Sequence, residues 1–166
     1  MPDLLAHALI AYTVALLLSW RYAWVTAPYA TVVMAGAFIP DLIKIKLLVP
    51  SGQVEQLLGI PFDWGAIHTA GGAVVAVLIG VLLVAPRERR RVGLLLALGA
   101  ISHLVADALL LNPSGQSYAI LWPLTRVYPP TPGLYLSTQP EPTIVTAGIA
   151  LVVWTVTRMR KQPAGS

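Results

Sequence analysis

The sequence predicts an all-α protein, a polytopic membrane helical bundle of about five transmembrane helices in a single domain, residues 1–166. Hydrophobic residues make up 57% of the 166 positions and charged residues only 11%, whereas a soluble domain has about 25% charged residues. The apolar residues fall in long blocks, and the basic residues gather at the block ends. These three features together are typical of an integral membrane protein.

Five apolar blocks predict the spanning helices. The two longest reach the ~20 residues that cross a hydrocarbon core of about 30 Å, and soluble helices are rarely apolar on every face for so long. The amphipathic Leu42–Val49 extends the second block. We expect the first block to be retained, because Asp3 stands where a signal peptide has basic residues. The blocks are Leu4–Trp20, Val25–Ile39, Ala66–Ala85, Val92–Leu111 and Thr143–Thr157.

The basic residues predict the orientation. With five spans, Arg21, the arginines of 87–91 and the basic residues of 158–161 fall on one side, which is the cytoplasmic side by the positive-inside rule. Lys44, Lys46 and Arg126 are exceptions. We therefore expect a protein of the cytoplasmic membrane, with its N-terminus outside and its C-terminus inside. Because these cations sit at helix ends, they do not indicate a nucleic-acid partner.

The other ionisable residues gather in the opposite, outer half. All three histidines and every acidic residue except Glu88 fall there, although only Lys and Arg entered the assignment. His103 and Asp107 are four residues apart and share one helix face. A carboxylate inside an apolar span costs about 2.5–3.5 kcal/mol. The pair is either a hydrogen-bonded contact between helices or a pair of metal ligands.

Three further residues have both a structural and a functional interpretation. Asp41 after Pro40 is a helix N-cap or a ligand, and His68 is an interfacial hydrogen-bonding group or a ligand. His7 lies four residues after Asp3, which could be favourable charge at a helix N-terminus. Three imidazoles and several carboxylates on one side of a membrane are the ligand set of a zinc-type site.

Two segments frame this polar cluster. The stripe of Gly72, Ala76 and Gly80, spaced by four, predicts close helix packing. Asn112–Pro142 (residues 112–142) holds half of the prolines, so we expect an extracytoplasmic Pro-rich loop that packs over the cluster.

The motifs resemble a known family. His7, Pro40-Asp41, Gly65–Thr69, Ser102–Asp107 and Leu121–Leu124 are similar to those of the LexA-binding inner-membrane-associated hydrolases, which in turn distantly resemble zinc-dependent phospholipases C. The resemblance covers most of the chain. It implies one metal site of Asp41, His68, His103 and Asp107, with His7 and a shared Asp107 in a second.

The sequence departs from that family pattern in three places, one of which is that it has no later His and Asp set for a third metal. Ile43 and Lys44 stand where the family has Asp-His, and Asp63 and Trp64 stand where it has His-Arg. Asp63 can replace a histidine ligand, because carboxylate oxygen also binds zinc. Lys44 cannot, and a cation beside a metal ion is unfavourable.

The resemblance implies a hydrolase that uses a divalent metal, zinc in the first place, to cleave a phosphoester of a lipid or lipid-linked substrate at the outer face. Asp63 or Asp3 would act as general base. One alternative is a non-catalytic structural or partner-binding protein with a degenerate metal site. A small transporter is less favoured, because no polar groups lead from His103 toward the cytoplasmic half. Membrane lipids are the expected partners.

The metal hypothesis requires His103, Asp107, His68 and Asp41 to converge within about 5 Å of one point. The predicted block ends at Leu111, which puts His103 about 12 Å inside its helix. Convergence therefore requires different helix ends or tilted helices.

Overall fold

The computed structural model describes residues 2–161, with the side chains of residues 4–161. The all-α prediction is confirmed, because six α-helices, two 3-10 helices and no strand occur in this part of the chain. The elements are α1 (Pro2–Arg21), α2 (Ala27–Phe38), η1 (Pro40–Leu47), α3 (Ser51–Leu58), η2 (Trp64–His68), α4 (Ala70–Leu82), α5 (Arg89–Asp107) and α6 (Glu141–Lys161).

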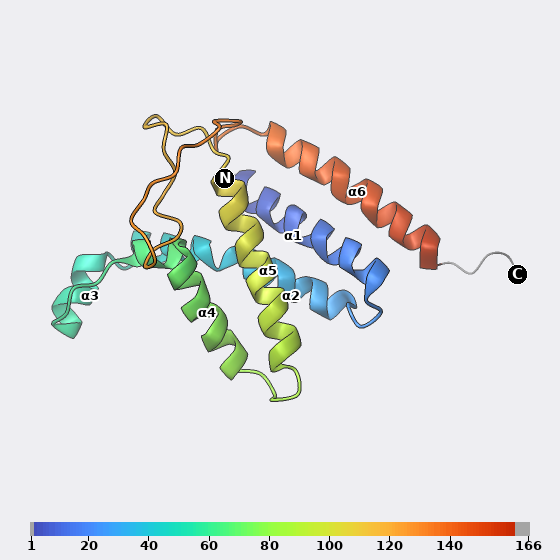
Figure 1. The fold of residues 1–166 in the computed structure, drawn as a ribbon, viewed down its shortest axis with the longest axis horizontal. Helices are drawn as coiled ribbons and strands as arrows, with labels where there is room; N and C mark the ends of the chain where they lie inside the picture. The colour runs from blue at the N-terminus through green and yellow to red at the C-terminus, as the bar shows by residue number, and fades with distance from the viewer. Residues whose placement is uncertain (1, 162–166) are drawn as a thin grey trace, which may run out of the picture.

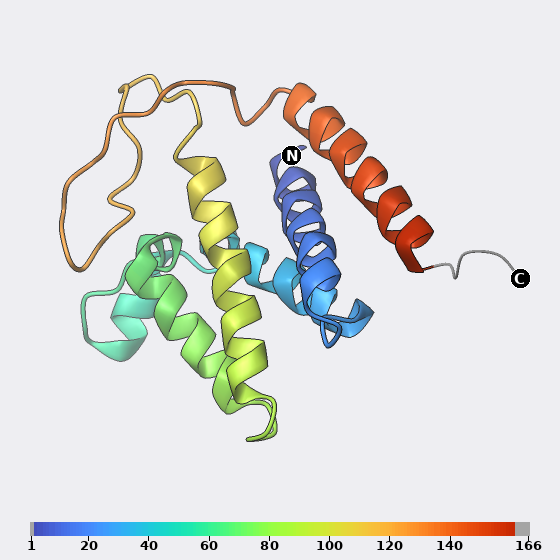
Figure 2. The same cartoon turned by 45° about the vertical axis from the view of Figure 1, so that its right-hand side comes forward.

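The helices α1, α2, α4, α5 and α6 alternate in direction (Figures 1 and 2). At one end of the bundle, Tyr29 at the start of α2 donates a hydrogen bond to Glu88, which precedes α5. At the other end, His7 near the start of α1 lies 3.1 Å from Asp107 at the end of α5. The bundle therefore has one end with histidines and one with arginines.

The predicted number of about five spanning helices is wrong for the described chain, in which two helices, α1 and α6, are long and apolar enough to cross a membrane. With 12 and 13 residues, α2 and α4 are about 18–20 Å long, well short of ~30 Å. Helix α5 has 19 residues but contains Arg89–Arg91 and Asp107.

The predicted block Ala66–Ala85 is divided in the structure. Thr69 has an extended backbone (φ −130°, ψ 165°) and separates η2 from α4. Its hydroxyl accepts a hydrogen bond from the Gly72 backbone N–H at 3.2 Å, which is an N-cap. This break places His68 on a separate turn that leads into the bundle interior. The short helix α3 was not predicted.

The closest helix approach joins α2 to α5. A Cβ atom on Gly99 would lie 2.0 Å from the Val33 carbonyl oxygen, and one on Gly36 would lie 2.3 Å from the Leu96 carbonyl oxygen. Within the predicted stripe, Gly72 instead faces the backbone of η2, and Gly80 faces a side chain of α5. The stripe thus contains one equally tight contact, at Gly72, where a Cβ atom would lie 2.0 Å from the Ala66 carbonyl oxygen, but the contact between α2 and α5 lies outside it.

The long segment between α5 and α6 lies against the bundle. Its backbone carbonyls accept hydrogen bonds from the first residues of α4. The Ala70 backbone N–H donates to the Ile120 carbonyl at 2.7 Å, and the Gly71 backbone N–H donates to the Trp122 carbonyl at 2.9 Å. The hydroxyl of Tyr135 donates to the carbonyl of Ala106 at 2.8 Å. Figure 2 shows the segment passing over the end of the bundle where α4 begins and α5 ends.

Candidate metal centre

Five polar side chains meet where four elements come together. His7 comes from α1, Asp41 from η1, His68 from η2, and His103 and Asp107 from α5. The three histidines and Asp107 are buried, and His103 is only 1% exposed. The structure therefore brings together all five residues that the sequence suggested as metal ligands.

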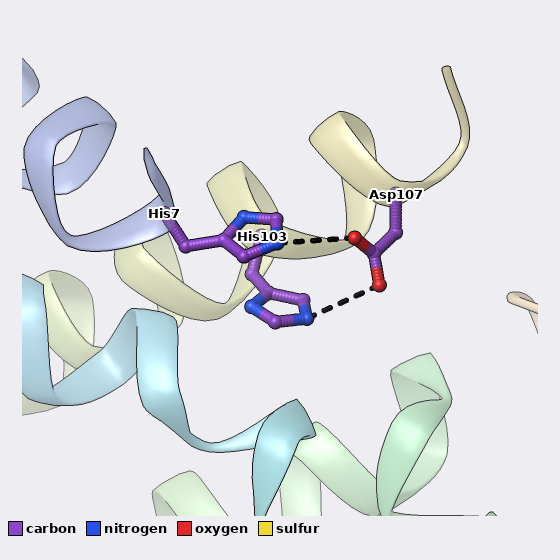
Figure 3. Close-up of side chains that lie close together, drawn as sticks. All are labelled: His7, His103 and Asp107. Carbon is purple, nitrogen blue, oxygen red and sulfur yellow. Dashed lines mark ion pairs between the residues drawn. The ribbon is translucent and has the colours of Figure 1, made fainter. Parts of the chain in front are cut away.

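Asp107 is at the middle of this cluster. Its Oδ2 lies 2.9 Å from Nε2 of His68 and 3.3 Å from Nε2 of His103. Its Oδ1 lies 3.1 Å from Nε2 of His7. Figure 3 shows His7 and His103 pointing toward this carboxylate. One carboxylate thus faces three imidazoles, with its two oxygens on different sides.

The histidines also contact one another. Nε2 of His103 lies 3.3 Å from Nε2 of His68. The rings of His7 and His103 stack with centroids 3.8 Å apart. The Nε2 atoms of the three histidines therefore lie at the centre of the cluster.

These separations fit metal ligation. Two overlapping sets of ligand atoms each lie within 4.8 Å: His7, His103 and Asp107, and Asp41, His68 and His103. A tetrahedron with zinc–ligand bonds of about 2.0–2.1 Å has edges of about 3.3–3.4 Å. The distance of 3.3 Å between the Nε2 atoms of His68 and His103 is close to such an edge. The residue types and spacing suit zinc.

Asp41 has a competing partner. One carboxylate oxygen pairs with Nζ of Lys44 at 2.6 Å. The other, Oδ2, is buried and has no hydrogen-bond partner among the described residues. The N-cap position of η1 belongs to Ile39, so Asp41 is not the N-cap. The Lys44 cation, which departs from the family pattern, therefore contacts a candidate ligand directly.

The end of α5 explains how His103 reaches the cluster. The helix ends at Asp107 rather than at Leu111, so His103 lies about 6 Å from the helix end instead of about 12 Å. Ala108–Leu111 turn away from the helix axis, and Leu111 donates a backbone hydrogen bond to Tyr135. The sequence analysis placed His103 too deep in its helix because the predicted helix continued to Leu111, beyond the observed end at Asp107.

Of the two proposed general bases, Asp63 lies outside both sets of candidate ligand atoms. Asp63 is the N-cap of η2, and its Oδ1 accepts a hydrogen bond from the Gly65 backbone N–H at 2.8 Å. It lines an open cavity of about 740 Å³ that His68 also lines. The side chain of Asp3 lies outside the described residues. Asp63 can thus reach molecules that enter this cavity.

Tyr118 is a residue that the sequence analysis missed. Its ring packs edge-on against His68, with centroids 4.9 Å apart, and it lines the same cavity. It belongs to the long segment after α5, where no periodic pattern marks which side chains turn inward. Only the packing of that segment over η2 identifies it.

The comparisons with known proteins give one match. A family model described as YdjM inner membrane protein matches residues 1–164. No curated protein and no solved structure matches the chain.

Proposed function

The chain belongs to the YdjM inner membrane protein family, and we propose that it is a membrane-embedded, metal-dependent hydrolase. Its substrate would be a phosphoester of a lipid or lipid-linked molecule. The main support is the convergence of three imidazole Nε2 atoms on the buried carboxylate of Asp107. Ionisable side chains gathered between otherwise apolar helices are rare and mark functional sites.

The two sides of Asp107 suggest how metal would be held. Oδ2 faces His68 and His103, which lie with Asp41 in one ligand set. Oδ1 faces His7. Asp41, His68, His103 and Asp107 would hold one zinc ion, and His7 together with Asp107 would contribute to holding a second. With one ion, His7 would orient Asp107 instead.

The proposed chemistry divides roles among these residues. A bound zinc ion would lower the pKa of water toward about 7 and withdraw charge from a phosphoryl oxygen. Asp63 is the carboxylate that we assign as general base, because it lines the cavity that reaches His68. Tyr118 restricts the space beside His68. The long segment over α4 would limit the entry of water.

The surroundings of the cavity favour a lipid substrate. Beside it runs an apolar groove of about 860 Å³ along α4, and both are lined by Phe62, Asp63, Ala66 and Trp122. A molecule with a polar end and an apolar tail would place its phosphoester near His68 and its tail in this groove. We further propose that the arginine-rich end faces the cytoplasm and that the site opens at the outer face.

The test is an assay of phosphate or headgroup release from mixed phospholipid vesicles containing the reconstituted protein. We expect activity with added zinc, none with chelator, and loss of most of the rate in His103→Ala. Ser102→Ala is the matched control on the same helix, because its hydroxyl only bonds to the Gly99 carbonyl. Full activity in His103→Ala would contradict the mechanism.

A non-catalytic family member with a degenerate metal site is the second candidate. The ion pair between Lys44 and Asp41 favours it, because a bound cation would have to displace or tolerate the ammonium group. Zinc binding by wild-type protein that hydrolyses no lipid would favour this candidate.

Replacing Lys44 is expected to strengthen metal binding. Lys44→Met removes the cation 2.6 Å from Asp41 and frees that carboxylate. We expect the zinc dissociation constant to fall about tenfold, the equivalent of about 1.4 kcal/mol. Lys46→Met is the control, since Lys46 is exposed and has no ion pair with any described acid. Equilibrium dialysis against zinc measures the difference, and equal affinity in wild type and Lys44→Met would show that Asp41 is not a ligand.

A further inference from the structure

A second groove lies at the arginine-rich end of the bundle, away from the histidines. Its volume is about 410 Å³, and α1, α2 and α6 form its walls. Leu16, Val25 and Met34 are among its apolar lining residues, and Arg158 and Lys161 line it from the last turn of α6. The groove is thus apolar along its length and cationic at one end.

Three of the five side-chain hydroxyls that line this groove donate hydrogen bonds to backbone carbonyls of their own helices. Ser19 donates to the Leu16 carbonyl and Thr31 to the Pro28 carbonyl, both at 2.7 Å. Thr157 donates to the Val153 carbonyl and accepts from the Trp20 indole. Because helix carbonyls and the indole take up these hydroxyls, the walls suit an aliphatic chain rather than a polar ligand.

The two cations that line the groove, Arg158 and Lys161, have no acidic partner among the described residues. Within residues 4–161, Arg158 and Lys161 form no ion pair, and no carboxylate lines the groove. Arg158 instead stacks over the Trp154 ring at 4.5 Å, and Arg160 stacks over the Trp20 ring at 4.3 Å. Arg158 and Lys161 are three residues apart on one helix face. Their uncompensated charge favours an anion.

The walls place this groove next to lipid. Two of its three walls are α1 and α6, the helices that are long and apolar enough to span a membrane. We propose that the groove binds an anionic phospholipid, with an acyl chain between α1, α2 and α6 and the phosphate at Arg158 and Lys161. Charge complementarity selects an anionic lipid over a zwitterionic one. This proposal does not depend on hydrolysis at the histidine cluster.

The first test measures lipid preference in the full-length protein. Protein in nanodiscs containing phosphatidylglycerol and phosphatidylcholine is extracted in detergent, and the retained lipid is quantified by native mass spectrometry. We expect one phosphatidylglycerol per protein. Arg158→Gln and Lys161→Gln should each reduce its retention about fivefold, the effect of about one juxtamembrane charge. Arg87→Gln, on an exposed side chain outside the groove, should change nothing.

The second test fills the groove without changing charge. Thr31 lines the groove and Thr155 does not, although both are exposed helical threonines whose hydroxyls bond to their own helix. Thr31→Trp should lose the retained lipid, and Thr155→Trp should keep it. Equal retention in both, or equal loss in Arg87→Gln and Arg158→Gln, would overturn the proposal. If phosphatidylglycerol and phosphatidylcholine were retained in proportion to their abundance, the retained lipid would be bulk lipid and the groove would not select an anionic one.

Discussion

Asp107→Asn is expected to abolish the stabilisation of this protein by zinc. At a zinc concentration 100 times the dissociation constant, binding to the native state adds about 2.7 kcal/mol to the free energy of unfolding. Asp107 faces all three histidines, and even residues that only orient metal ligands change affinity by about 10–100-fold. A loss of 100-fold or more would reduce the zinc effect to about 0.4 kcal/mol or less.

Thermal unfolding in detergent, with zinc and with chelator, measures this effect. The asparagine side chain keeps the shape of the carboxyl group but replaces one acceptor oxygen that faces the imidazoles, so metal-free D107N should unfold at a lower temperature than metal-free wild type. The zinc-dependent shift is therefore compared within each protein. Asp63→Asn is the control, because Asp63 caps η2 and lies outside both ligand sets; it should keep the zinc effect. If D107N were stabilised by zinc as strongly as wild type, the cluster would not be a metal site.

Gly99→Ala is expected to destabilise the bundle by forcing α2 and α5 apart. The new Cβ would lie 2.0 Å from the Val33 carbonyl oxygen and 2.6 Å from the Ala37 nitrogen. Both atoms are backbone, so α2 and α5 must separate. Overpacking costs about 1–3 kcal/mol and sometimes more, which here exceeds the gain of about 1 kcal/mol in helix propensity.

The melting temperature in detergent should fall in this variant, by about 2–8 °C for a net cost of about 1–2 kcal/mol. Because His103 follows Gly99 by one turn on the same face of α5, zinc affinity should fall as well. Gly148→Ala is the matched helical glycine, with no atom within 4 Å of its new Cβ, and it should not lower stability. Equal melting temperatures for the two variants would show that α2 and α5 can adjust without cost.

Much of the architecture follows from local properties of the sequence. Apolar blocks of defined length predicted helices close to α1, α2, α5 and α6, because the length and apolarity of a block depend only on neighbouring residues. The separation of the histidines from the arginines was also predictable. Successive helices that alternate in direction place the end of one helix beside the start of the next, so residues at those positions gather at the same end of the bundle. The candidate ligands could be named because a buried carboxylate or imidazole is unusual in an apolar block.

Other features depend on contacts between distant segments. The break at Thr69, the end of α5 at Asp107 and the close approach of Gly36 and Gly99 could not be read from any one block. Each is decided by which backbone or side chain lies opposite, tens of residues away in the chain.

The composition thus determined an all-α, membrane-associated chain with a polar end and a basic end. Tertiary structure alone decided that Asp107 stands among three imidazoles, that Lys44 competes for Asp41, and that Arg158 and Lys161 border an apolar groove. The physical reason is that charge and hydropathy belong to single residues, whereas ligand geometry and cavity shape arise only when helices pack.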